Sequence, residues 1–196
     1  MAERNAKVKR DTQETSIQVD LTIDGKSTHE ITTGIRFFDH MLCQLAQHGT
    51  FDIKLSATGS DNHHVIEDTA MTLGKAFSQA LGERQGIVRM AHSFVPMDDA
   101  LAMVALDVGG RGYSVVETPF NHSNISDMPS DLIRHFIITF ASEAKINIHA
   151  KILHGVNDHH KAEATFKALA RALDQATRID PRISDVLPST KKVIER

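Results

Sequence analysis

The chain has 196 residues, 41% of them hydrophobic, which is enough for a single domain with a packed core. Its 22 lysine and arginine residues against 25 aspartate and glutamate residues give a net charge of −3, which argues against partners such as nucleic acid or an anionic membrane surface. One cysteine excludes an internal disulfide framework, and without a transmembrane-length apolar run or a secretory signal we expect a cytoplasmic protein.

The chain begins with strand patterns. A short basic cluster over residues 7–10 is expected on an edge strand or a solvated arm. Apolar and polar residues alternate from Ile17 to Ile23, and this segment ends at Asp24-Gly25, a pair that is typical of a hairpin turn. We therefore expect a strand followed by a tight turn in this part of the chain.

Two helices follow, with a strand between them. Residues 35–47 have helical spacing, residues 51–55 alternate as in a strand, and residues 60–81 carry a His-His-x-x-Glu sequence at the start of an amphipathic helix. These helices contain the candidate ligands of the first half: His40, His63, His64 and Glu67.

The second half of the chain repeats the pattern. Strands are predicted over 100–108, 113–117 and 146–150, and helices over 132–144 and 156–173. A second His-His-x-x-Glu sequence opens the last helix. The candidate ligands of this half are His135, His159, His160 and Glu163.

The spacing of the histidines supports a duplication. His40 lies 63 − 40 = 23 residues before His63, and His135 lies 159 − 135 = 24 residues before His159. A match at this separation, together with the same order of elements, indicates that the two halves are related.

The predicted fold is therefore α+β. We expect one domain over 1–196, made of two homologous half-repeats at about 1–92 and 93–196, in which each half reads strand, strand, helix, strand, helix. Each half is expected to form a four-stranded mixed sheet with two helices packed on one face. The end of the chain, around Pro188, is expected to be an irregular tail.

The His-His-x-x-Glu sequence suggests metal ligation. Residues four apart lie on one face of a helix, so His63 and Glu67 can bind the same ion. His64 is rotated by about 100° and faces elsewhere, so adjacent histidines suit two ions better than one.

Two equivalent sites follow from the duplication. The first predicted ion is bound by His63, Glu67 and His160. The second is bound by His159, Glu163 and His64. His40 and His135 add one ligand each. Three imidazoles and one carboxylate leave positions open for water or substrate, as in a catalytic site. Such ligands suit Mn, Fe, Co, Ni or Zn, and ligand type does not choose among them.

Five longer motifs carry a resemblance to a known family: FFDHMLCQLAQHGTFD (37–52), DNHHVIEDTAMTLGKA (61–76), PMDDAL (96–101), NDHHKAEATFKALARAL (157–173) and PSTK (188–191). With these motifs the sequence resembles the imidazoleglycerol-phosphate dehydratases of histidine biosynthesis from about residue 9 to 191. Val65, Asp99 and Lys192 depart from the usual pattern, and none of the three is a candidate ligand.

The resemblance implies an activity and a set of functional residues. It implies a hydro-lyase that removes water from D-erythro-imidazoleglycerol phosphate to give imidazole acetol phosphate, with two Mn²⁺ per subunit bound by the eight ligands above. It implies Glu14 as a candidate acid/base residue, with metal-bound water or a ligand carboxylate as the alternative. The implied phosphate and substrate contacts are Arg89, Arg111, Lys167, Ser189 and Lys191. The family also implies a homo-oligomer of 24 subunits, with metal sites shared between chains.

Two other functions fit parts of the pattern. A dinuclear hydrolase would use similar ligands to activate water, but the aspartates expected to bridge two close ions are scarce here. A metal-storage or scaffold protein would also bind ions, but it has no need of the basic residues Arg89, Arg111, Lys167 and Lys191. Product analysis separates the first alternative, and phosphate binding beside the ions separates the second.

Overall fold

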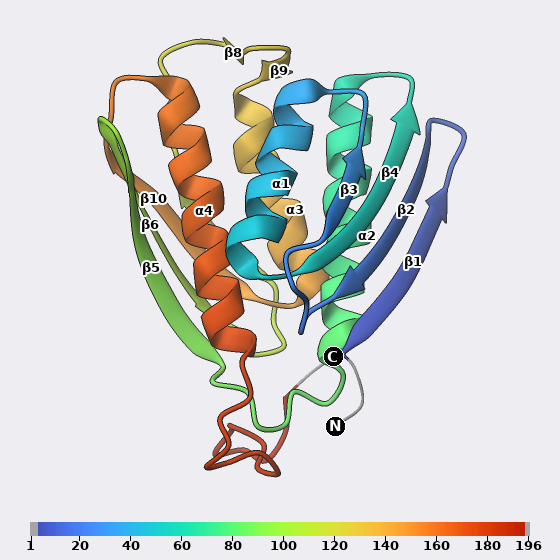
Figure 1. Ribbon diagram of the computed structural model, residues 1–196, viewed down its shortest axis with the longest axis vertical. Helices are drawn as coiled ribbons and strands as arrows, with labels where there is room; N and C mark the ends of the chain where they lie inside the picture. The colour runs from blue at the N-terminus through green and yellow to red at the C-terminus, as the bar shows by residue number, and fades with distance from the viewer. Residues whose placement is uncertain (1–3, 195–196) are drawn as a thin grey trace.

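The computed structural model describes residues 4–194, in which four helices lie between two four-stranded sheets (Figure 1). The helices are α1 (Arg36–Gly49), α2 (Asn62–Leu81), α3 (Asp131–Ala144) and α4 (Asp158–Thr177). The α+β class and the two four-stranded mixed sheets predicted from the sequence are confirmed. Within the described residues, no helix is both long enough and apolar enough to span a membrane.

The first sheet contains β1 (Asn5–Asp11), β2 (Thr15–Thr22), β3 (His29–Thr32) and β4 (Asp52–Gly59), in the order β1-β2-β4-β3. The predicted hairpin at Asp24-Gly25 is wrong, because β4 lies between β2 and β3 and pairs with β3 in parallel. The Asp52 side chain explains the difference, since its Oδ1 accepts the backbone N–H of Lys26 and Thr28 at 2.8 and 2.7 Å. These bonds direct the chain past the start of β4.

The second sheet has the same order of strands. Its members are β5 (Met90–Met97), β6 (Ala100–Asp107), β10 (Asn147–His154) and β7 (Tyr113–Glu117), and β7 pairs with β10 in parallel. Each four-stranded sheet thus has one more strand before the first helix of its half than the pattern indicated. The chain passes from one sheet to the other between α2 and β5, a few residues before position 92. A short pair, β8 (Asn124–Ile125) with β9 (Met128–Pro129), precedes α3.

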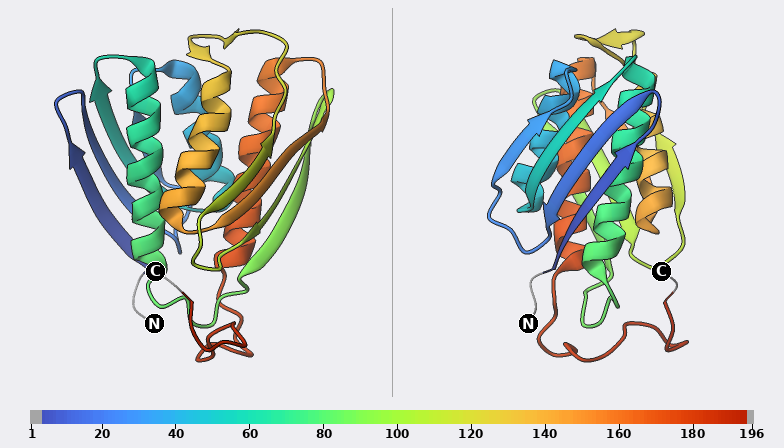
Figure 2. Two further views of the ribbon diagram at one scale, coloured as in Figure 1. Left: turned by 180° about the vertical axis from the view of Figure 1, so that it is seen from behind. Right: turned by 90° about the vertical axis from the view of Figure 1, so that its right-hand side faces the viewer.

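The helices share one core between the sheets (Figure 2). Helices α1 and α2 contact the first sheet and α3 and α4 the second, while α1 also packs on α4 and α2 on α3. Buried aromatic rings join the halves. The ring centroid of Phe136 on α3 lies 5.4 Å from those of both Phe38 on α1 and Phe166 on α4. The amino ends of all four helices lie at one end of the molecule, away from both ends of the described chain (Figure 1).

Candidate metal centres and anion pocket

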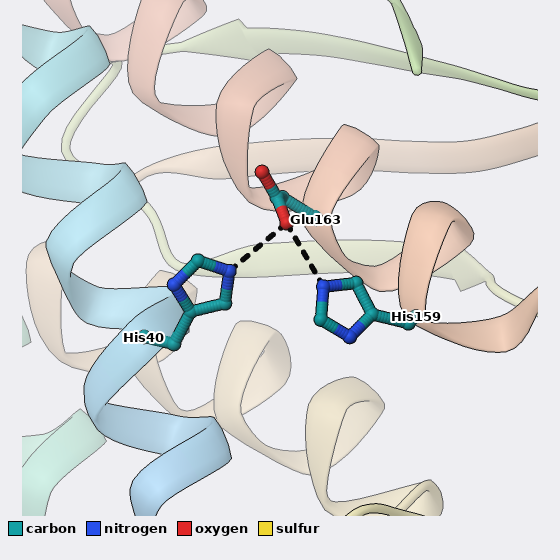
Figure 3. Close-up of side chains that lie close together, drawn as sticks. All are labelled: His40, His159 and Glu163. Carbon is teal, nitrogen blue, oxygen red and sulfur yellow. Dashed lines mark hydrogen bonds and ion pairs between the residues drawn. The ribbon is translucent and has the colours of Figure 1, made fainter. Parts of the chain in front are cut away.

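The first group of candidate ligands joins the two halves of the chain (Figure 3). His40 comes from α1, whereas His159 and Glu163 come from α4. The Nε2 atoms of His40 and His159 lie 2.9 and 3.1 Å from the same Oε2 atom of Glu163. One ligand atom from each residue lies within 4.8 Å of the others, a spacing that can hold a metal ion.

Local structure sets this geometry. His159 and Glu163 are four residues apart and so lie on one face of α4. The helix begins here because the Asn157 side chain accepts the backbone N–H of His159 at 2.9 Å, as an N-cap residue does. The ring of Phe37 packs edge-on against His159 with centroids 5.2 Å apart, which restricts the imidazole.

The second group is the counterpart of the first. His63 and Glu67 come from α2 and His135 from α3, again with one ligand atom each within 4.8 Å. Nε2 of His135 lies 3.2 Å from Oε1 of Glu67, and the rings of His63 and His135 are 4.9 Å apart. Each group therefore combines the upstream histidine of one half with the His-His-x-x-Glu sequence of the other.

The donor chemistry of both groups fits a divalent ion. In the second group, Nε2 of His135 is buried and makes no hydrogen bond, so a bound cation would give it a partner. In the first group, two imidazole nitrogens converge on one carboxylate oxygen. Two imidazoles and one carboxylate per group are fewer ligands than a tetrahedral or octahedral ion needs, so further ligands must come from elsewhere.

His64 and His160 lie outside both groups. Nδ1 of His64 is 2.5 Å from the Asp61 carboxylate, and Nδ1 of His160 is 2.6 Å from Oδ1 of Asp99. Within one chain the predicted sets that pair His160 with Glu67 and His64 with Glu163 are not formed. A role for these two histidines as ligands stays a prediction for an assembly of chains.

The two glutamates have different electrostatic surroundings. Burial alone would raise the pKa of Glu163, but hydrogen bonds from Lys167 and His40, and their charges, lower it to about 2. Nζ of Lys167 is 2.7 Å from Oε1 of Glu163, so Lys167 lies at the first metal group. Glu67 is more exposed, and Met71 occupies the position on α2 that Lys167 occupies on α4.

Glu14 lies at the turn between β1 and β2. Its side chain is 59% exposed, and its Oε2 is 3.7 Å from Nε2 of His64. The equivalent turn between β5 and β6 places Oδ2 of Asp98 3.5 Å from Nε2 of His160. His64 and His160 thus each have a carboxylate from a hairpin beside them.

Four of the five predicted phosphate contacts line one cavity of about 240 Å³: Arg89, Arg111, Ser189 and Lys191. We call this cavity the anion pocket. Arg89 also anchors the C-terminal segment, since its Nη1 donates to the carbonyl of Pro188 at 2.6 Å. Its Nε donates to Asp107 at 2.7 Å, and this hydrogen bond raises the pKa of Arg89.

The anion pocket is far from the metal groups of the same chain. The backbone N–H of Arg89 donates to the carbonyl of Ala176 at 2.8 Å, in the last turn of α4. Ala176 follows Glu163 by 176 − 163 = 13 residues, which spans about 20 Å along a helix. One chain therefore places its metal groups at one end and its anion pocket at the other.

The sequence predicted no role for three aspartates near the site. Asp99 holds His160 and the start of α4, and Asp158 binds the buried Lys161 at 2.8 Å. Asp68, the residue after Glu67, contacts the β1–β2 hairpin. Position next to a ligand could have indicated Asp68 and Asp158. No local pattern indicates Asp99, because it reaches α4 from a different hairpin.

Together the fold and the site define a duplicated α+β protein with two candidate metal groups and a separate pocket for an anion. The chain belongs to the imidazoleglycerol-phosphate dehydratase family, whose model matches residues 33–173. Members of this family are hydro-lyases, and the enzyme class predicted from the sequence is thereby confirmed.

Relatives and solved structures agree with this family. The imidazoleglycerol-phosphate dehydratase of a Dehalococcoides mccartyi strain is 60% identical over 195 residues and covers both chains completely. That of Chloroflexus aurantiacus is 51% identical over 194 residues, covering 97% of this chain and 95% of its own. A crystal structure of the Pyrococcus furiosus protein superposes with a TM-score of 0.83 at 33% identity, covering 95% of this chain and 99% of that one.

Proposed function

We propose that the protein converts D-erythro-imidazoleglycerol phosphate to imidazole acetol phosphate by loss of water, with two Mn²⁺ per subunit. The observation that carries this proposal is the pair of His–Glu groups in a chain that also has an anion pocket. The family assignment supplies the reaction. A cytoplasmic location remains a prediction.

The residues that would hold the two ions are the ligands of the two groups, with His64 and His160 as further ligands. Imidazole and carboxylate donors suit Mn²⁺, and the resemblance to the family favours it over other metals. When bound there, a divalent ion would favour the deprotonated form of the substrate imidazole.

The chain's own residues would orient the substrate and move its protons. Arg111, Lys191 and Ser189 would bind the phosphate, since convergent cationic and hydroxyl donors are what a phosphate requires. Glu14 is exposed and lies beside His64, so it would carry a proton to or from the carbon skeleton. Fixing the phosphate would place the reacting carbons in one orientation.

The distance between the pocket and the metal groups supports a homo-oligomer. A ring joined through three carbons to a phosphate is shorter than an extended tripeptide, which spans roughly 10 Å. It cannot reach across the roughly 20 Å between Glu163 and Arg89 in one chain. A complete active site therefore needs groups from more than one chain, and the resemblance implies an assembly of 24.

The outer face of the second sheet also supports association between copies. The strand register places Met90, Phe94, Met103 and Tyr113 on this face, and Met90, Phe94 and Tyr113 are each more than half exposed. Three strands of eight residues and one of five give two such faces about 900 Å² together, close to the roughly 1,000 Å² of a specific interface. Aromatic and Met side chains are enriched in such interfaces.

Elemental analysis of the purified protein, combined with turnover measurements, tests the proposal. We expect two manganese ions per chain, loss of ketone product after chelation, and recovery when manganese is returned. Release of inorganic phosphate in place of the ketone would support a dinuclear hydrolase instead. Bound metal without turnover, and without phosphate binding, would support a storage protein.

A substitution in the anion pocket tests the substrate-binding residues. We expect Arg111→Ala to raise KM by about tenfold or more, as loss of a charge-assisted hydrogen bond does, and to weaken binding of inorganic phosphate. Isothermal titration with phosphate measures the second effect. Unchanged values for both would remove Arg111 from the site.

A further inference from the structure

The turn that carries Glu14 has a fixed backbone. The hydroxyl oxygen of Thr12 accepts the backbone N–H of Glu14 at 3.1 Å and of Thr15 at 3.0 Å. The carbonyl of Glu14 accepts the backbone N–H of Ser60 at 3.1 Å, just before α2. Only the side chain of Glu14 is left to the solvent, where it faces His64.

Asp68 attaches both strands of this hairpin to α2. Its Oδ1 accepts Nε–H of Arg10, on β1, at 2.8 Å, and its Oδ2 accepts the hydroxyl of Thr15, the first residue of β2. Asp68 and Thr15 are only 7% and 4% exposed, so water competes little for these bonds. Asp68 follows His64 by four residues and so lies on the same face of α2.

We propose that Asp68 is a positioning residue, which clamps the β1–β2 hairpin to α2 and thereby keeps the Glu14 carboxylate beside His64. The inference rests on the proposed acid/base role of Glu14. The clamp acts through two side chains that flank the turn, one on each strand. Its loss would let the turn shift on α2, and a carboxylate displaced by 1 Å can cost about a hundredfold in rate.

The other half of the molecule fastens its hairpin in a different way. Ala164 occupies the position on α4 that Asp68 occupies on α2. There the β5–β6 hairpin itself supplies the carboxylate, because Asp99 accepts the backbone N–H of Asn157 at 2.9 Å and contacts Nδ1 of His160 at 2.6 Å. Each hairpin is thus held to its helix by one carboxylate. In the first half the carboxylate belongs to the helix, and in the second half it belongs to the hairpin. A shared attachment built from different residues points to a requirement of the site.

A double-mutant cycle in the manganese-loaded enzyme tests the inference. Glu14→Gln, Asp68→Asn and the double variant are compared by kcat and KM, with metal content and assembly mass measured for each. We expect Asp68→Asn to lower kcat by about 10- to 100-fold with KM and metal content near those of the wild type. In the Glu14→Gln background the same change should have almost no further effect on kcat, because a residue that acts through Glu14 has nothing left to position.

The outcomes separate this inference from the proposed function. Equal factors for Asp68→Asn in both backgrounds, or a normal kcat in Asp68→Asn, would overturn the positioning role and leave the role of Glu14 intact. Normal turnover by Glu14→Gln would overturn the roles of both residues. Loss of metal or of assembly mass in Asp68→Asn would also overturn it, since the effect would then be a general structural one.

Two further variants give a milder form of the test and a matched control. Arg10→Gln removes one arm of the clamp from the edge strand, where the arginine side chain is 34% exposed, and should give a smaller loss of kcat that also disappears in the Glu14→Gln background. Asp20→Asn is the matched control. It breaks the 2.6 Å pair with Lys7 across the same two strands but on the outer face, and it should leave kcat unchanged.

Discussion

The two halves of the molecule have the same order of elements but differ in what surrounds them. In the first half, every outward residue of the sheet is polar or charged, as in the row Lys7–Asp20–Lys54–Glu30. In the second half, the equivalent face carries Met90, Phe94 and Met103. The two halves therefore share the histidines and glutamates of the two candidate metal groups, whereas their outer surfaces differ.

The helices that carry the ligands have diverged in the same way. Asp158 and the buried Lys161 at the start of α4 correspond to Asn62 and Val65 at the start of α2. The comparison separates the features that both halves share, namely the candidate ligands, from the features that only one half has. The predictions below test this distinction.

The largest effect is expected from the two glutamates that both halves retain. Glu67→Gln and Glu163→Gln should each lower kcat by more than about a hundredfold. Substitution of a residue that only hydrogen-bonds to a metal ligand can already lower activity by up to that factor. Each should also lower the manganese content from two ions to one per chain, measured by elemental analysis. Full turnover by either variant would show that the two groups are not equivalent in function.

The next effect concerns the charge pair that only the second half has. Asp158→Asn leaves Lys161 buried without its carboxylate and should lower the free energy of unfolding by about 3 to 5 kcal/mol. Adding Lys161→Val copies the first half and should restore most of that loss. Urea denaturation of the metal-free protein measures both. Asp174→Asn, which breaks a surface pair between α4 and Arg178, the residue that follows this helix, is the control and should cost less than about 1 kcal/mol. A double variant as unstable as Asp158→Asn would contradict the prediction.

A pH dependence should follow from Glu163. Its pKa is lowered from 4.5 to about 2, so its charge stabilises the folded chain above pH 4.5 and this contribution is lost as the pH falls through about 2. The shift corresponds to about 3 kcal/mol. The difference in unfolding free energy between the metal-free wild type and Glu163→Gln should be constant above pH 5 and less than half as large at pH 3. An unchanged difference at pH 3 would show that the pKa is not lowered.

The smallest effect is expected from the outer faces. Phe94→Glu should weaken association by about 1.5 to 3 kcal/mol, the free energy of burying a phenylalanine side chain. Lys9→Glu, at the equivalent position of the first sheet, should leave association unchanged. Sedimentation velocity over a range of concentrations measures both. Equal losses of assembly mass would mean that the apolar face is not a special contact.

The sequence by itself determined the repeat, the fold class and a set of candidate ligand residues. These properties follow from local geometry. Spacing of four residues places His63 with Glu67 and His159 with Glu163 on any helix, whatever surrounds it. The same spacing could not place β3, because the order of strands depends on contacts such as that of Asp52 with Lys26.

Only the tertiary structure decided which histidine joins which glutamate. His40 meets Glu163 of the other half because Phe38, Phe136 and Phe166 pack the helices of both halves into one core. The same packing separates the anion pocket from the metal groups by the length of α4 and brings Asp68 to Arg10, 58 residues away in the chain. Such contacts join residues that are distant in sequence, so no local pattern contains them.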